Sequence, residues 1–230
     1  MPERGVGKAL RKALAGEREE AVKPGAEALL LNKHRREVFQ QLCLKPCATP
    51  GAVARALGIS PNAVAWHLQK LEEAGFLARA GADAAFPAGL IAATDVGIFL
   101  LLAKEAIRAA LVAVMNEPGS SLESVATASG STRQTASRAL VVLERDGLVS
   151  VVRDGRANRY FPTDLLAQRR EGNAKRALAF SEAVLVRLRG EGVRPQVVRR
   201  TAQEFMVLLG ERPASPFLHL RTDPFTTVLG

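Results

Sequence analysis

Residues 131–149 (STRQTASRALVVLERDGLV) hold the side chains best suited to chemistry with a partner. Read as a helix, this stretch has one narrow apolar stripe of Ala136, Leu140 and Leu143. Thr132 suits the N-cap position, and Gly147 suits the left-handed residue that ends a helix. Arginine can pair with guanine and glutamine with adenine in the major groove, each pair contributing roughly 1–3 kcal/mol of discrimination. The face opposite the stripe consists of Gln134, Arg138, Val141 and Arg145, with Arg133 at the entry.

A solvated surface helix is the alternative interpretation, but the residues that follow favour DNA recognition. Residues 148–153 (LVSVVR) alternate and are β-branched, Asp154 and Gly155 suit a hairpin turn, and residues 157–161 (ANRYF) predict a returning strand. Arg153, Arg156 and Arg159 lie at or beside this turn. Two helices followed by a hairpin with a basic tip have the layout of a winged helix-turn-helix, whose tip contacts phosphates or the minor groove.

Three segments resemble known DNA-binding regulators. Residues 132–140 (TRQTASRAL) and 143–148 (LERDGL) resemble recognition helices of the MarR and catabolite-activator-type regulators. That resemblance implies that Arg133, Gln134, Ser137 and Arg138 contact bases or phosphates. Residues 60–77 (SPNAVAWHLQKLEEAGFL) resemble the recognition helix of ArsR-type regulators, and residues 94–97 (TDVG) resemble the entry to the helix after the wing in MarR-like proteins. The resemblance covers about residues 26–162.

An internal repeat places this pattern twice in the chain. Residues 46–77 align without a gap on residues 118–149, at an offset of 72 (118 − 46 = 72), with nine of the 32 positions identical. Most identities fall at predicted core or turn positions, as expected when one small fold occurs twice. The identical pairs are Pro46/Pro118, Val53/Val125, Ala54/Ala126, Ala56/Ala128, Gly58/Gly130, Leu68/Leu140, Leu71/Leu143, Glu72/Glu144 and Gly75/Gly147.

The predicted fold is mainly α with small β-wings: two tandem winged helix-turn-helix domains with a helical C-terminal extension. The boundaries are a charged arm over 1–24, domains over 25–93 and 94–162, and an extension with a docked tail over 163–230. In the first domain we expect helices at 25–44, 49–57 and 60–74 and wing strands at 76–79 and 86–91. In the second, an apolar helix from 94 to about 116 precedes helices at 121–129 and 131–146. In the extension we expect a helix over 163–189 broken near Gly172, an amphipathic helix over 196–209 and an extended tail over 214–230.

The two predicted reading heads are chemically unequal. The face of the first recognition helix has one cation and one anion, and its wing (80–86) contains Asp83 and no basic residue, so it should bind phosphates weakly. Trp66 could stack on a base or sugar, be buried in a protein interface, or fold back on its own domain. His67 matches a position at the edge of the core and is interpreted as structural. The candidate DNA contacts of this head are Ser60, Asn62, Trp66, Gln69 and Lys70.

Charge also favours a polyanionic partner. The net charge is +9, and residues 133–200 contain 15 Lys or Arg against 7 Asp or Glu, a balance of +8 (15 − 7). A basic solvated surface is the alternative. The apolar stretch 96–115 is interrupted by Lys104, Glu105 and Arg108, which predicts a buried helix rather than a membrane span. With no secretory signal apparent, we expect a cytoplasmic, nucleoid-associated protein.

Other motifs predict little chemistry. Cys43 and Cys47 lack the four ligands of a zinc site, so packing is favoured over a redox or metal role. The arm over 1–24 is frayed, docks as a helix or reaches along DNA, and its residues 5–8 (GVGK) lack the spacing of a phosphate loop. Three separated histidines (His34, His67, His219) and the lack of HExxH, GxSxG or dinucleotide motifs argue against an enzyme, and no metal or cofactor is implied.

We therefore predict a transcription regulator that binds double-stranded DNA mainly through its second winged domain. The alternatives are a tandem winged-helix adaptor for protein partners, of the kind found in segregation and condensation protein B and in polymerase-associated subunits, and a nonspecific chromatin protein. The C-terminal helices either form a homodimer or brace the two domains within one chain. A small apolar effector between the helices is a further option that the sequence does not identify.

Overall fold

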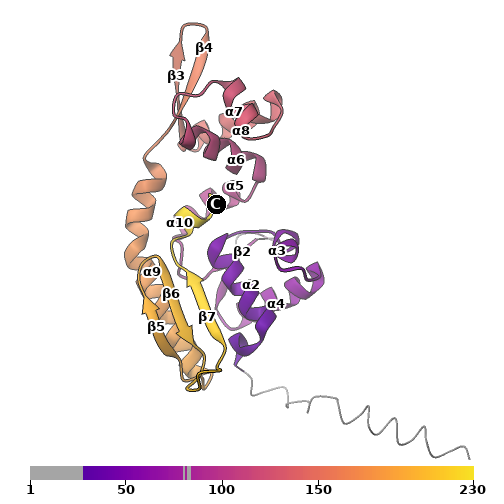
Figure 1. The fold of residues 1–230 in the computed structure, drawn as a ribbon, viewed down its shortest axis with the longest axis vertical. Helices are drawn as coiled ribbons and strands as arrows, with labels where there is room; N and C mark the ends of the chain where they lie inside the picture. The colour runs from indigo at the N-terminus through magenta and orange to yellow at the C-terminus, as the bar shows by residue number, and fades with distance from the viewer. Residues whose placement is uncertain (1–27, 80, 82–83) are drawn as a thin grey trace, which may run out of the picture.

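The computed structural model describes residues 28–79, 81 and 84–230. The predicted arm over 1–24, with its three alternatives, and Ala80 and Asp83 of the first wing lie outside these residues. The described chain is rich in helices and contains small antiparallel sheets, which confirms the mainly α fold class (Figure 1). None of its helices is both long and apolar enough to cross a membrane.

The first half of the described chain is a three-helix unit followed by a hairpin. The side chains of Thr49 and Ser60 accept from backbone N–H groups and cap two of its helices, each of which has a proline at its start. Gly58 makes the turn between them at φ +67°, a conformation that favours glycine. The elements are η1 (Leu29–Leu31), α2 (Lys33–Leu44), α3 (Pro50–Leu57), α4 (Pro61–Glu73), β1 (Leu77–Arg79) and β2 (Ala85–Pro87). The hairpin occurs as predicted, although its second strand ends at Pro87 rather than at residue 91.

The same order of elements recurs in the second half. The elements are η2 (Ala93–Asp95), α5 (Val96–Leu102), α6 (Glu105–Asn116), α7 (Leu122–Ala128), α8 (Arg133–Arg145), β3 (Val149–Asp154) and β4 (Ala157–Pro162). The prediction of one helix from 94 to 116 was wrong, because the chain is extended at Lys104 and starts a new helix at Glu105. The two pieces contact different neighbours: Phe99 of α5 packs on Phe225, with the ring centroids 4.9 Å apart, whereas α6 packs on α7, α8 and β4.

The C-terminal region differs most from its prediction. Its elements are α9 (Leu165–Gly190), β5 (Gln196–Arg200), β6 (Glu204–Leu208), β7 (Phe217–Arg221) and α10 (Pro224–Thr227). Helix α9 continues through Gly172, because its buried stripe resumes at once with Asn173 and Ala177. The predicted helix over 196–209 is instead two strands of an antiparallel sheet in the order β5-β6-β7, and the predicted tail supplies β7. The region is thus one long helix with a sheet, not a purely helical extension.

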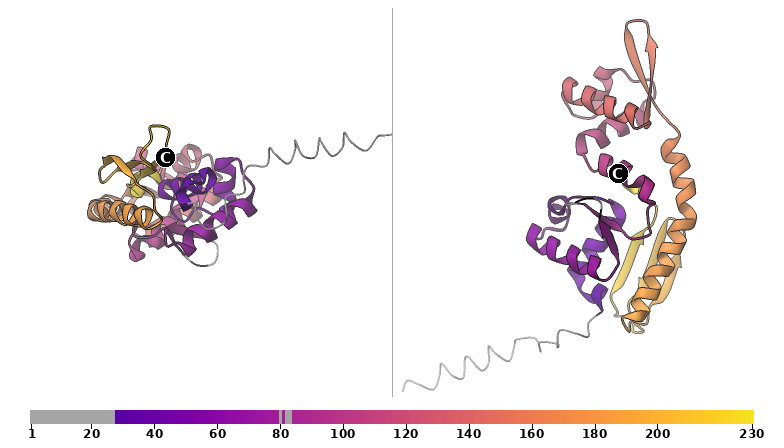
Figure 2. Two further views of the ribbon diagram at one scale, coloured as in Figure 1. Left: turned by 90° about the horizontal axis from the view of Figure 1, so that it is seen from below. Right: turned by 180° about the vertical axis from the view of Figure 1, so that it is seen from behind.

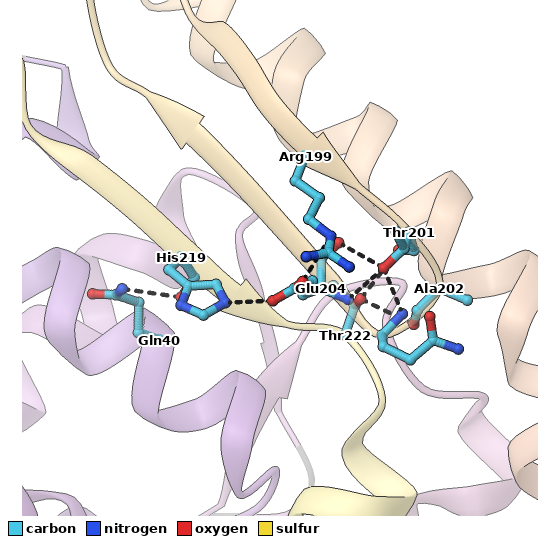
Figure 3. Close-up of polar contacts among 8 residues, drawn as sticks. Gln40, Arg199, Thr201, Ala202, Glu204, His219 and Thr222 are labelled. Carbon is cyan, nitrogen blue, oxygen red and sulfur yellow. Dashed lines mark hydrogen bonds and ion pairs between the residues drawn. The ribbon is translucent and has the colours of Figure 1, made fainter. Parts of the chain in front are cut away.

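Helix α9 runs along one side of the molecule and touches both halves (Figures 1 and 2). At its start, Thr163 Oγ1 donates to the carbonyl oxygen of Gly147 at 2.6 Å, which ties it to the end of α8. Farther along, Phe180 packs on Phe39 of α2, with the ring centroids 6.2 Å apart. Strand β7 packs against α2, where Gln40 Nε2 donates to the carbonyl oxygen of His219 at 3.0 Å (Figure 3). The C-terminal region therefore braces the two halves within one chain.

Candidate nucleic-acid interface

Helix α8 is built to expose one face. Thr132 Oγ1 accepts from Thr135 N at 3.2 Å and caps its start, and Gly147 follows its end at φ +73°. Ala136, Leu140 and Leu143 are buried, as their spacing predicted, together with Ala139. The opposite face therefore points to solvent along the length of the helix.

The predicted contact residues of α8 lie mostly on this open face. Thr132, Arg133, Gln134 and Arg138 are exposed, whereas Ser137 is half-buried between the two faces. Val141, one turn farther along, is 62% exposed, an unusual position for a β-branched apolar side chain on a helix that has a core available to it. The face of this helix that carries Arg133, Gln134 and Arg138 is thus accessible, which is the condition that a recognition helix must meet.

The second hairpin has a tight, basic tip. Asp154 pairs with Ala157, so its two-residue loop is Gly155 and Arg156, with Gly155 at φ +61°. This turn lies one residue later than the Asp154-Gly155 turn that the sequence suggested. Arg153 and Arg156 are exposed, and Arg159 is half-buried with its Nε donating to Asp154 Oδ2 at 3.2 Å.

Ion pairing divides the arginines of this half into two groups. Arg133 pairs with Glu123 at 3.1 Å, Arg145 with Asp146 and Arg159 with Asp154. All three pairs are largely exposed, so little free energy opposes their opening. The second group makes no ion pair within the described part of the chain, and it comprises Arg138, Arg153 and Arg156. Their charge is available to a polyanion from α8 and from the hairpin next to it.

The first recognition face is neutralised internally. Lys70 Nζ lies 2.6 Å from Glu73 Oε2, and Gln69 Nε2 donates to Glu73 Oε1 at 2.9 Å. These hydrogen bonds lower the pKa of Glu73, so its carboxylate stays ionised beside the lysine. Ser60 is exposed but is already used as the cap of α4, and Asn62 is exposed. This face therefore offers phosphates less charge than α8 does.

Trp66 takes an intermediate position on that face. It is 49% exposed, with the guanidinium carbon of Arg35 5.1 Å from its ring centroid and the His67 ring 5.0 Å away edge-on. His67 is only 6% exposed, and burial, followed by the charges of Arg35 and His34, lowers its pKa. One face of the indole is therefore engaged by its own domain, while about half of the side chain is available to a partner.

The two cysteines lie in the core of the first half. Both are nearly inaccessible; burial raises the pKa of Cys47 to about 12 and that of Cys43 well above its usual value. Within the described residues, no group of three or more His, Cys, Asp or Glu side chains is placed to hold a metal ion. Their environment is that of packing residues.

Arg55 is an exposed cation that was not among the predicted contact residues, because those were taken from the recognition helices and wings. Arg55 lies in the last turn of α3, is exposed and forms no ion pair with the described residues. The repeat offset places it opposite Thr127 (55 + 72 = 127), so comparing the two halves outside their recognition helices reveals it. It is a further candidate for a phosphate contact beside the first recognition helix.

Residues 30–80 match a family model described as "Helix-turn-helix domain". Among solved structures, the chain is similar to the transcriptional regulator SlyA, with 23% identity over 37% of this chain and 73% of that chain, and a TM-score of 0.25. It is also similar to ScpB of Mycobacterium tuberculosis, with 21% identity, coverage of 59% and 93%, and a TM-score of 0.24. The MarR-family protein Rv2887 of the same organism gives 19% identity, coverage of 64% and 96%, and a TM-score of 0.24. None of the curated proteins compared with the chain matches it significantly.

The family match coincides with the first three-helix unit and the first strand of its hairpin. It covers α2, α3, α4 and β1, the segment in which the sequence resembles ArsR-type regulators. Residues 30–80 of this chain are therefore a helix-turn-helix domain.

Proposed function

We propose that the chain is a DNA-binding transcription regulator with two tandem winged helix-turn-helix domains, of which the second is the main reader. The observation that carries this proposal is the set of three exposed arginines on α8 and its hairpin that make no ion pair with the described residues. Unpaired cations on one accessible face release counterions from DNA when they meet phosphates, and ion-paired cations do so less effectively. The adjacent Arg133 and Gln134 add the side-chain types that pair with guanine and adenine.

In this proposal α8 enters the major groove and the β3–β4 hairpin contacts the backbone beside it. Arg133, Gln134, Ser137 and Arg138 face base edges or phosphates, while Arg153, Arg156 and Arg159 follow the phosphates. The first domain adds weaker contacts, for which the candidates are Ser60, Asn62, Trp66, Gln69 and Lys70. Because α9 and the sheet join both halves, one chain can present two reading heads, as a two-fold dimer does elsewhere.

Selection of bound fragments from a random DNA pool, followed by fluorescence anisotropy on the selected duplex, tests this function. Replacing Arg133 and Arg138 by alanine should weaken binding by about 5- to 150-fold per residue, since each base pairing contributes roughly 1–3 kcal/mol. Arg212→Ala, an exposed arginine on the loop before β7, serves as the control and should leave affinity unchanged. Equal affinity of the double variant and the wild type would contradict the assigned site, and equal affinity for every duplex would indicate chromatin packaging.

A protein-binding adaptor is the second candidate function, favoured by one feature of the first domain. Trp66 is half-exposed on a face whose lysine is already paired, a combination more typical of a protein interface than of a DNA groove. A stoichiometric protein partner lost on Trp66→Ala, together with no salt-sensitive DNA binding, would establish the adaptor and exclude the regulator.

A further inference from the structure

A small polar cleft lies between α9 and the end of the C-terminal sheet. Its volume is about 290 Å³, at the lower end of the range for small-molecule pockets, roughly 300–1,000 Å³. Its walls come from the first half of α9, from the turn between β5 and β6, and from the residues that follow β7. Six polar side chains line it: Arg170, Glu171, Asn173, Gln203, Thr222 and Asp223.

Asn173 is the unusual member of this set. It opens the buried stripe of α9, ahead of Ala177 and Phe180, and is only 5% exposed. Its Oδ1 atom is buried and accepts no hydrogen bond from the described residues. Buried carboxamides are normally hydrogen-bonded, because an unsatisfied polar group loses the partners it had in water. This carboxamide therefore needs a partner, and the wall on which it lies opens into the cleft.

The walls of the cleft are held in place before any ligand arrives. Thr222 is fully buried, and its Oγ1 donates to the carbonyl oxygen of Ala202 at 3.0 Å, which fixes the β5–β6 turn against the end of β7 (Figure 3). Arg170 Nε donates to Asp223 Oδ2 at 2.7 Å, and the same oxygen accepts from Thr226 Oγ1 at 2.9 Å. A preformed site of this kind spends little binding free energy on ordering itself.

The charges of the lining residues select the ligand. Arg170 contributes one positive charge, and Glu171 and Asp223 contribute two negative charges, so the cleft is net anionic (1 − 2 = −1) and disfavours phosphates and other polyanions. The terminal nitrogens of Arg170 form no hydrogen bond with described residues, and a guanidinium binds a carboxylate well. A ligand that suits these groups carries an ammonium group, which donates to Asn173 Oδ1 and is attracted by the two carboxylates, and a carboxylate group for Arg170.

We infer that this cleft binds a free α-amino acid, with the ammonium group donating to Asn173 Oδ1 and to the Glu171 carboxylate, and the carboxylate against the terminal nitrogens of Arg170. The site lies on α9, which is tied to the end of α8 at one end and to α2 farther along. The assignment concerns ligand binding alone and stands independently of any activity toward DNA.

Thermal unfolding of the full chain with each of the twenty amino acids tests the inference. A ligand present at about one hundred times its Kd should raise the Tm by about 5–10 °C. Matched amines and carboxylates that lack the second group, such as putrescine and acetate, should have no effect. A panel in which no amino acid raises the Tm overturns the inference, and so does an equal rise with putrescine or acetate.

Substitutions then locate the effect, with isothermal titration calorimetry as the direct measure of binding. Asn173→Leu and Glu171→Gln should each abolish the Tm rise and the binding heat. Glu171 is exposed, so its variant folds even if the change in the buried stripe does not. Gln168→Leu, on the same helix but outside the cleft, is the control and should bind as the wild type does. Retention of the full effect in Glu171→Gln and in a folded Asn173→Leu overturns the assignment.

Discussion

Removal of the three unpaired arginines of the second half should change the salt dependence of DNA binding by a calculable amount. Arg138, Arg153 and Arg156 are exposed and make no ion pair with the described residues, so each can neutralise a phosphate without first breaking a contact. Each such contact contributes about 0.9 to the slope of log K against log salt concentration, and three contribute about 2.7. Between about 50 and 200 mM salt, a fourfold change, the wild type should therefore lose about 40-fold more affinity than the triple glutamine variant does.

The assay is a fluorescence-anisotropy titration of the selected duplex at several salt concentrations. A second triple variant, with glutamine at Arg194, Arg199 and Arg212, removes the same net charge from the C-terminal region and should keep the wild-type slope. Arg194 and Arg199 are paired with Glu211 and Glu204, which is why their charge is less available. The reasoning is refuted if the first triple variant keeps the full slope. It is equally refuted if both variants lower the slope by the same amount, because net charge and not contact would then set the dependence.

Three further predictions concern stability and reactivity. The Phe39→Ala variant loses a fully buried ring that packs on two other aromatic rings, which should lower the free energy of unfolding by about 3–5 kcal/mol. Calorimetry should then show a single transition with the Tm lowered by about 6–20 °C. A change in Tm under about 2 °C would show that α2 and α9 do not unfold together. Burial, and after it the charge of Arg35, lowers the pKa of His67 from 6.5 in the folded chain, so protonation favours the unfolded chain. The Tm of the wild type should therefore fall as the pH drops below about 6.5. An equal fall in the Tm of a His67→Gln variant would contradict this reasoning. Burial raises the pKa of the Cys47 thiol from 9.0 to about 12, which reduces its thiolate fraction about 1,000-fold, and Cys43 is buried as well. Neither cysteine should therefore react with Ellman's reagent until guanidinium unfolds the chain. Rapid labelling of the native protein would disprove their burial.

Apart from the break at Lys104 inside the helix expected over 94–116, sequence patterns predicted the elements of residues 46–162 well, because local signals agree there. Caps at Thr49, Ser60 and Thr132 each precede a helix at the expected residue, and a glycine in the left-handed region follows or joins these helices. Apolar spacing in α8 also identified its buried face, and therefore its exposed one. Most of the site residues of α8 and its hairpin are exposed, Ser137 and Arg159 are half-buried, and the role of all of them in binding DNA remains a prediction.

The C-terminal region was harder to predict because its short segments satisfy two periods. In residues 196–209, Val197, Phe205 and Leu208 can be placed on one side of a helix, yet Phe205 and Val207 are buried by a strict alternation within β6. The strand forms instead of the helix because β7, from a later part of the sequence, pairs with β6 and places Leu220 opposite Phe205 and Leu218 opposite Val207. Gly172 led to the opposite error, the prediction of a break in a helix that is continuous. Glycine weakens a helix locally, but packing on both sides of Gly172 keeps α9 continuous.

The charge of residues 133–200 shows why a count of cations along the sequence does not identify a DNA-binding surface. Much of the net charge of +8 in this segment lies on α9 and the C-terminal sheet. Several arginines there form ion pairs with carboxylates from inside and outside the segment: Arg169 with Asp95, Arg170 with Asp223, Arg189 and Arg200 with Glu182, and Arg194 with Glu211. A paired guanidinium must exchange one anion for another when DNA arrives, whereas an unpaired one exchanges only mobile ions and gains their entropy. We therefore expect the unpaired arginines of α8 and its hairpin to contribute more to DNA binding than the paired arginines of α9 and the sheet. Among the described residues of this segment, the exposed cations without an ion pair are Arg138, Arg153 and Arg156 on α8 and its hairpin, and Lys175 and Arg176 on α9.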